Sequence, residues 1–263
     1  MYSNYISANM EHTPTVRYVS ISVTYREVIA RAFALTSLLG ILFILVSQWS
    51  EYVAILDLLD KKLMLILNFR GSRYTDNFWY DYSQKWLWMP LAAVALWTSV
   101  RDYPRDKRDK LVFFLVTILL VAFLDQLSSG VIKPLVGRLR PSHDPAIAPM
   151  LHYVNGYRGG QHGFVSGHAT VSVGIITWLG MIYRDKLTRI SLILFSGMLC
   201  YSRIYLGVHY PGDILCGAFL GFFSAYFLFP FLSQKIKIHS TIKRPYVILF
   251  VFYLTLVILL IHA

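Results

Sequence analysis

The sequence predicts an all-α, polytopic membrane protein. Hydrophobic residues make up 56% of the 263 residues and charged residues only 15%, whereas soluble domains carry about 25% charged residues. The mean hydropathy is positive, at +0.52. Apolar runs close to the length of about 20 residues that a helix needs to cross a bilayer recur along the chain. We therefore expect one membrane domain, residues 1–263, with a six-helix transmembrane core at residues 32–232.

Seven apolar runs account for the expected membrane helices. Six of them form the core, at residues 32–49, 86–100, 111–132, 164–183, 190–208 and 213–232. A seventh run, residues 246–261, is extra to the core and is long enough to cross. The sequence leaves open whether this last helix spans the bilayer or lies flat on it.

Two segments outside these runs are expected at the membrane interface. The N-terminal segment, residues 1–31, is polar and mixed, and its stretch 16–31 fits an interfacial helix. Between residues 53 and 67, Leu and Ile recur at helical spacing among charged residues, which is typical of an amphipathic helix lying in the interface. This helix and the aromatic residues that follow it, from Trp79 to Trp88, either anchor and pack only or form a lid beside a lipid entrance.

The formal charge of +11 comes from Lys and Arg spread through short loops between the spans. Membrane topology explains this spread better than a nucleic-acid-binding surface, so no nucleic-acid partner is expected. With the N-terminus inside, the inner segments hold more Lys and Arg than the outer ones. The positive-inside rule then places the remaining loops on the outer face of the membrane. The two cysteines, Cys200 and Cys216, fall in apolar segments and are interpreted as core thiols.

Polar residues with catalytic potential occur in three stretches, all near span ends on the outer side. The stretches are residues 133–141, the tripeptide Ser166-Gly167-His168, and residues 202–213. Together they supply several cations, two imidazoles, one carboxylate and a helix start. The candidate site residues are Lys133, Arg140, Arg203, His168, His209, Asp213, Ser166 and Gly167.

The three cations suit the binding of a phosphate group. Arg140 and Arg203 each offer a planar fork for phosphate oxygens, and Lys133 offers a point charge. Lys133 and Arg140 are seven residues apart and would share a helix face, although Pro134 and Gly137 leave a loop curled around an anion equally open. Cations at a span end can also merely anchor lipid headgroups, which is the simpler alternative.

The second stretch fits the start of a helix. Ser166 is a good N-cap, and the free amides of Gly167 and His168 in a first helical turn are suited to binding an anion. Ser166 Oγ and these two amides are therefore expected to face the phosphate. Plain helix capping is the alternative interpretation.

His209 is the expected nucleophile. Asp213 falls in the first turn of the helix that begins near Pro211, where it can accept a proton from one imidazole nitrogen and leave the other free to attack. His168 then serves as the general acid for the leaving oxygen and afterwards as the base for water. Asp125, inside the third run, is a functional candidate as an intramembrane carboxylate, but hydrogen-bonded packing or the balancing of nearby cations would also explain it.

The combined pattern Lys-x6-Arg-Pro, Ser-Gly-His and Ser-Arg-x5-His-x3-Asp resembles the type 2 phosphatidic acid phosphatase superfamily, to which vanadium haloperoxidases and glucose-6-phosphatase are related. The matching positions are Lys133, Arg140, Pro141, Ser166, Gly167, His168, Ser202, Arg203, His209 and Asp213. Val165 departs from the pattern, because the family usually has Pro there. The resemblance, over about residues 86–232, implies metal-independent hydrolysis of a lipid phosphate without a cofactor, through a phosphohistidine on His209, at a site facing the periplasm.

The resemblance implies a phosphorylated membrane lipid as substrate. Bacterial relatives act on phosphatidylglycerol phosphate, undecaprenyl pyrophosphate or lipid A, and segments 141–145 and 159–168 are somewhat more similar to lipid A phosphatases. Candidate headgroup contacts in this loop are Arg138, His143, His152, Arg158, Gln161 and His162. The three loop histidines raise the possibility of zinc, but they lack ligand spacing, so no metal is expected.

Two other functions fit parts of the pattern. A lipid carrier or flippase would use the basic residues for binding only, but binding alone needs no nucleophile–acid pair of the kind that His168 and His209 form. Halide oxidation is disfavoured because the related haloperoxidases are soluble.

Overall fold

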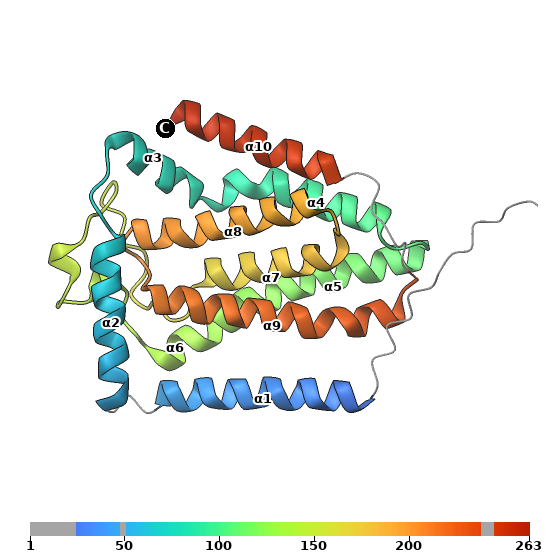
Figure 1. The fold of residues 1–263 in the computed structure, drawn as a ribbon, viewed down its shortest axis with the longest axis horizontal. Helices are drawn as coiled ribbons and strands as arrows, with labels where there is room; N and C mark the ends of the chain where they lie inside the picture. Colours follow the sequence, from blue (N-terminus) through green and yellow to red (C-terminus); the bar gives the residue numbers. More distant parts are fainter. Residues whose placement is uncertain (1–24, 48–50, 238–244) are drawn as a thin grey trace, which may run out of the picture.

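The computed structural model describes residues 25–47, 51–237 and 245–263, and these form an all-α bundle, as predicted. Most long helices run side by side, and α2 crosses them at one end (Figure 1). The α-helices are α1 (Tyr25–Ser47), α2 (Glu51–Leu67), α3 (Arg73–Tyr82), α4 (Met89–Asp102), α5 (Lys107–Asp125), α6 (Lys133–Val136), α7 (Gly167–Ile182), α8 (Lys186–Tyr205), α9 (Pro211–Lys235) and α10 (Pro245–His262).

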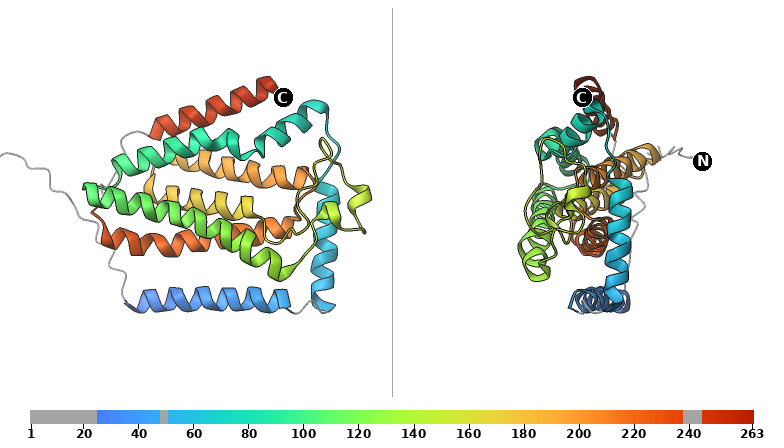
Figure 2. Two further views of the ribbon diagram at one scale, coloured as in Figure 1. Left: turned by 180° about the vertical axis from the view of Figure 1, so that it is seen from behind. Right: turned by 90° about the vertical axis from the view of Figure 1, so that its left-hand side faces the viewer.

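Several of these helices can cross a membrane. Within the described ranges, the continuous stretch Lys107–Val136, α8 and α9 are each long and apolar enough to do so, and α7 and residues 246–262 are apolar but shorter. α10 packs along α4 and α8 and runs in the general direction of the bundle (Figures 1 and 2). This arrangement favours a spanning α10 over one that lies flat.

The N-terminal boundary differs from the predicted one. α1 begins at Tyr25, so residues 25–31, which were expected in the interfacial segment, continue into the first long helix. The rest of that predicted segment, residues 1–24, lies outside the described residues. α1 meets the bundle where Arg31 lies over the ring of Tyr226 on α9, 5.7 Å from its centroid.

The helix predicted at residues 53–67 is confirmed as α2, which lies across one end of the bundle, and its position in the membrane interface stays a prediction (Figure 2). Its charged side chains Asp57, Asp60 and Lys61 reach other parts of the chain. Among its apolar side chains Met64 is buried, whereas many others are exposed. The exposed apolar residues of α2 are Ile55, Leu56, Leu58, Leu59, Leu63 and Ile66. The aromatic segment that follows is only partly at the surface, because Tyr82 and Trp88 are buried in the core while Trp86 is exposed.

Small residues bring α7 and α9 together in the most extensive helix pair of the fold. Gly217 and Gly221 lie one turn apart on α9, and a Cβ atom at either position would collide with the main chain of α7, at Ser166 O and Thr170 O respectively. Close approach through such residues is typical of packed membrane helices. Because Asp213 lies one turn before Gly217, this contact also places the start of α9 beside the start of α7.

The third predicted span continues further than expected. After α5 the chain forms a π-helical segment, η2 (Gln126–Ile132), and then α6, which ends where Gly137 adopts a left-handed conformation with φ of +64°. Lys133 is therefore on the helix and Arg140 is in the loop beyond it. The shared helix face proposed for these two residues is wrong, because Gly137 ends the helix between them.

Candidate active site

The three motif stretches meet at the end of the bundle crossed by α2 (Figure 1). Lys133 comes from α6, His168 from the first turn of α7, and Arg203 from the last turn of α8. His209 lies between α8 and α9 and is within electrostatic range of Lys133, Arg140 and Arg203. His168 is in turn within range of Arg203 and His209. The two imidazoles and three cations thus lie at one site.

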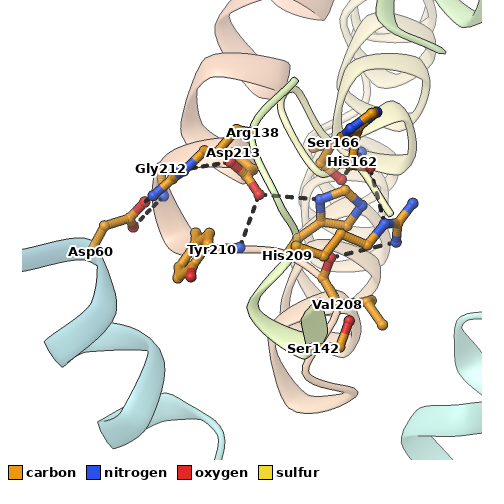
Figure 3. Close-up of polar contacts among 12 residues, drawn as sticks. Asp60, Arg138, Ser142, His162, Ser166, Val208, His209, Tyr210, Gly212 and Asp213 are labelled. Atoms are coloured by element: carbon orange, nitrogen blue, oxygen red, sulfur yellow. Dashed lines mark hydrogen bonds and ion pairs between the residues drawn. The ribbon is translucent and has the colours of Figure 1, made fainter. Parts of the chain in front are cut away.

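His209 and Asp213 form the expected pair. His209 Nδ1 lies 3.4 Å from Asp213 Oδ2, both side chains are buried, and the contact is seen in Figure 3. Asp213 is fixed by the start of α9, since its Oδ2 also accepts a hydrogen bond of 3.1 Å from the Tyr210 amide. With Nδ1 directed at the carboxylate, Nε2 is the ring nitrogen available for attack.

The surroundings of His209 favour its neutral form. Burial, followed by the positive charges of Arg140, Arg203 and Lys133, lowers the pKa of His209 well below the ordinary value. Only the neutral imidazole has a lone pair for attack on phosphorus, so this environment keeps the nucleophile in its reactive form at neutral pH.

Arg203 is buried with spare hydrogen-bonding capacity. It is 2% exposed, and its Nη2 donates to the Tyr157 hydroxyl at 3.1 Å. Its Nε is buried without a hydrogen-bond partner in the part of the chain that the structure describes. Buried donors are rarely left unpaired, so this nitrogen is well suited to an anionic ligand.

Within the part of the chain that the structure describes, the Arg140 side chain donates its hydrogen bonds to main-chain carbonyls. Its Nε donates to His162 O at 3.1 Å and its Nη1 to Val208 O at 3.4 Å. Burial and the neighbouring Arg203 lower the pKa of Arg140, but an arginine remains charged at any physiological pH. Neutral acceptors orient the guanidinium without compensating its charge.

The start of α7 has the predicted form. Ser166 is the N-cap and its Oγ accepts a hydrogen bond of 3.5 Å from the Ala169 amide, while its own amide donates to Asp213 O at 3.0 Å. A Cβ atom on Gly167 would lie 3.7 Å from Lys133 Nζ, so the ammonium group sits close to the first-turn amides. Ser166 Oγ therefore caps the helix, and its direct contact with phosphate stays a prediction.

The candidate headgroup residues are engaged in several ways. Arg138 pairs with three carboxylates, and His152 Nε2 contacts Asp76 Oδ1 at 2.8 Å. The others lie along the loop: His143 beside the Ser142 hydroxyl, Arg158 over the ring of Tyr153, and Gln161 and His162 offering main-chain carbonyls to Arg140. Asp125 Oδ1 lies 4.0 Å from Lys85 Nζ. Headgroup binding by any of these side chains stays a prediction.

Sequence reasoning missed three residues of this region. In the sequence, Asp57 and Asp60 stand out only as interruptions of an amphipathic helix. Their spacing of three residues places them on one helical face, and this spacing could have indicated a shared contact. Tyr157, which contacts Arg203, lies in a loop without a recognisable pattern. Among the described residues, no group of three or more His, Cys, Asp or Glu could hold a metal ion.

Residues 110–237 match the family model of the PAP2 superfamily. The lipid A 4'-phosphatase of Bacteroides thetaiotaomicron is 34% identical over 188 residues, which cover 71% of this chain and 82% of that protein. The chain belongs to the PAP2 superfamily. The lipid A 4'-phosphatase of Porphyromonas gingivalis is likewise 34% identical, over 65% of this chain and 71% of its own.

More distant relatives share the family. The undecaprenyl-diphosphatase of Sulfolobus acidocaldarius is 27% identical over 64% of this chain and 71% of that protein. A crystal structure of a transmembrane PAP2 type phosphatidylglycerolphosphate phosphatase from Bacillus subtilis has the same fold, with a TM-score of 0.54 at 20% identity over 77% of this chain and 96% of the other. This chain is a membrane-embedded phosphatase of the PAP2 family, as the fold and the motifs predict.

Proposed function

We propose that this PAP2 phosphatase removes a phosphate from lipid A through a phosphohistidine on His209. The observation that carries the proposal is the His209 ring, which is oriented by Asp213 and surrounded by Lys133, Arg140 and Arg203. A binding protein needs the cations but not the oriented imidazole. Lipid A is favoured over undecaprenyl pyrophosphate and phosphatidylglycerol phosphate because the two relatives at 34% identity are named lipid A 4'-phosphatases.

The proposed reaction has two steps. The cations and the first-turn amides of α7 hold the phosphate oxygens, His209 Nε2 attacks phosphorus, and the bond to the lipid oxygen breaks as His168 protonates that oxygen. His168 then takes a proton from water, and the resulting hydroxide breaks the phosphorus–nitrogen bond. Inorganic phosphate leaves and both histidines return to their starting states.

We place the site at the periplasmic face of the inner membrane. The supporting feature is a group of basic residues at the opposite end of the bundle, around the turns between α4 and α5 and between α7 and α8. These residues are Arg105, Lys107, Arg108, Arg184 and Lys186. Such loops face the cytoplasm by the positive-inside rule. An impermeant reagent that labels a single cysteine introduced at Gln161, but not one at Arg105, in intact spheroplasts would support this placement.

The test is phosphate release by the purified protein in EDTA, from lipid A, undecaprenyl pyrophosphate and phosphatidylglycerol phosphate in mixed micelles. We expect the highest kcat/KM on lipid A and no requirement for a divalent metal. A preference for either of the other lipids would contradict the proposed substrate.

His209→Ala is expected to lower kcat by at least about 10⁴-fold, since the nucleophile itself is removed. An acid-labile phosphoenzyme should form with labelled substrate in the wild type and not in this variant. Retention of full turnover by His209→Ala would show that the nucleophile is assigned wrongly. Lipid transport without phosphate release by the wild-type protein would instead favour the carrier alternative.

A further inference from the structure

Arg138 is surrounded by carboxylates although it lies two residues before a phosphate-site arginine. Its Nη1 is 2.8 Å from Asp213 Oδ1, and its Nη2 is 2.8 Å from Asp60 Oδ2 and 3.0 Å from Asp57 Oδ1. The ring of Tyr210 covers the guanidinium, with 4.0 Å between Arg138 Cζ and the ring centroid. With its charge compensated and its side chain 10% exposed, this residue is poorly placed to bind an anionic headgroup.

The two oxygens of Asp213 have separate partners. Oδ2 faces His209 Nδ1 and accepts from the Tyr210 amide, whereas Oδ1 accepts from Arg138 (Figure 3). Partners on both oxygens fix the plane of the carboxylate and hence the direction in which it orients the imidazole. Loss of Arg138 would free that rotation and leave a fully buried carboxylate without its cation.

Asp60 connects α2 to the same carboxylate. Its Oδ2 pairs with Arg138, and its Oδ1 accepts a hydrogen bond of 2.7 Å from the Gly212 amide in the first turn of α9. Asp57, one turn earlier on α2, also pairs with Arg138, but its other partner is Lys61 of its own helix at 2.9 Å, and its side chain is 31% exposed. Asp60 therefore reaches the active site by two contacts and Asp57 by one.

We propose that Arg138 is a positioning residue for the His209–Asp213 pair, and that the interfacial helix α2 takes part in catalysis by holding Arg138 and the first turn of α9 through Asp60. This proposal rests on the proposed role of His209. It makes α2 more than a membrane anchor, because a displacement of α2 would change the orientation of the nucleophile. Misplacement of a reacting group by about 1 Å can cost 10²-fold in rate, so a contact of this kind has a measurable effect.

The experiment compares Arg138→Ala, Arg138→Lys and Asp60→Asn with Asp57→Asn as the matched control, all in the full-length protein. We expect Arg138→Ala to lower kcat by about 10- to 100-fold with KM changed by no more than about threefold, because orientation and not substrate binding is lost. Arg138→Lys should restore part of kcat. Asp60→Asn should lower kcat by about tenfold, whereas Asp57→Asn should stay within about twofold of wild type.

The pH profile of kcat/KM separates positioning from a merely structural role. Arg138→Ala removes a cation from beside the His209–Asp213 pair, so the acidic limb of the profile should move to higher pH in this variant. A folded Arg138→Ala protein with the wild-type kcat and pH profile would overturn the proposal. If that variant does not fold, equal activities of Asp60→Asn and Asp57→Asn would overturn it.

The same measurements separate this proposal from the proposed function. If the wild type does not hydrolyse lipid A, the substrate assignment fails, and the variants are compared on whichever lipid phosphate it does hydrolyse. If His209→Ala is fully active, the nucleophile and the positioning role fail together. An inactive His209→Ala with an unaltered Arg138→Ala contradicts the positioning role alone.

Discussion

Arg138 and Arg140 stand two residues apart in one loop, yet their surroundings are opposite. Arg138 is compensated by the carboxylates of Asp57, Asp60 and Asp213, whereas Arg140 is held by the carbonyls of His162 and Val208. A carboxylate cancels the charge that it orients, and a carbonyl does not. In the proposed site, Arg138 is therefore part of the framework, and the charge of Arg140 remains for the substrate.

Removing each arginine in turn is expected to have the largest effect. Arg140→Ala and Arg203→Ala should each lower kcat/KM by about 10³-fold, because each removes a charge that stabilises the phosphoryl transition state. Inhibition by vanadate, a phosphate mimic, should weaken in both variants and persist in Arg138→Ala. Steady-state phosphate release with and without vanadate measures both effects, and equal loss of vanadate affinity in Arg138→Ala would abolish the distinction.

The pH dependence of the wild type tests the uncompensated charges directly. Burial and the cations near His209 lower its pKa, so its reactive neutral form persists as the pH falls below about 6.5. We expect the acidic limb of the kcat/KM profile, where His209 becomes protonated, to have its midpoint well below pH 6.5. An acidic midpoint at or above 6.5 would mean that the cations do not act on His209 as inferred.

A smaller effect is expected at Tyr157, which accepts a hydrogen bond from Arg203 Nη2. Although burial opposes it, the positive charge of Arg203 lowers the pKa of the Tyr157 hydroxyl. Tyr157→Phe should reduce kcat/KM by about three- to tenfold, since it removes one hydrogen bond that orients Arg203. Tyr80→Phe is the control, because the Tyr80 ring contacts Tyr157 without touching Arg203. Similar losses in the two variants would mean that the hydrogen bond to Arg203 is not the cause.

Much of the architecture could be predicted from the sequence because apolar runs and capping residues act locally. Ser166 and Asp213 start α7 and α9 where their spacing predicted, and the Leu and Ile pattern of residues 53–67 gives α2. The end of the third span was missed because its polar residues, up to Lys133, form a helix that stops only at Gly137.

The division of labour between Arg138 and Arg140 could not be predicted from the sequence. Both are loop arginines, and what separates them is contact with Asp57 and Asp60, about eighty residues earlier in the chain. Local spacing carries no information about such a pairing, because it depends on where α2 crosses the bundle. The contact between Tyr157 and Arg203 could not be predicted either, because it also joins residues that are distant in the sequence.

The two-sided character of α2 has a consequence for handling the protein. Leucine and isoleucine side chains cover the surface that it turns away from the bundle, and its carboxylates hold it to the bundle from the other side. A helix with one apolar exposed face and one charged face is suited to the boundary between the bilayer and water. We expect the enzyme to lose activity in a detergent that solubilises the bundle but covers the apolar face of α2 poorly. Its far-ultraviolet circular dichroism spectrum should stay unchanged. Added bilayer lipid should restore the activity.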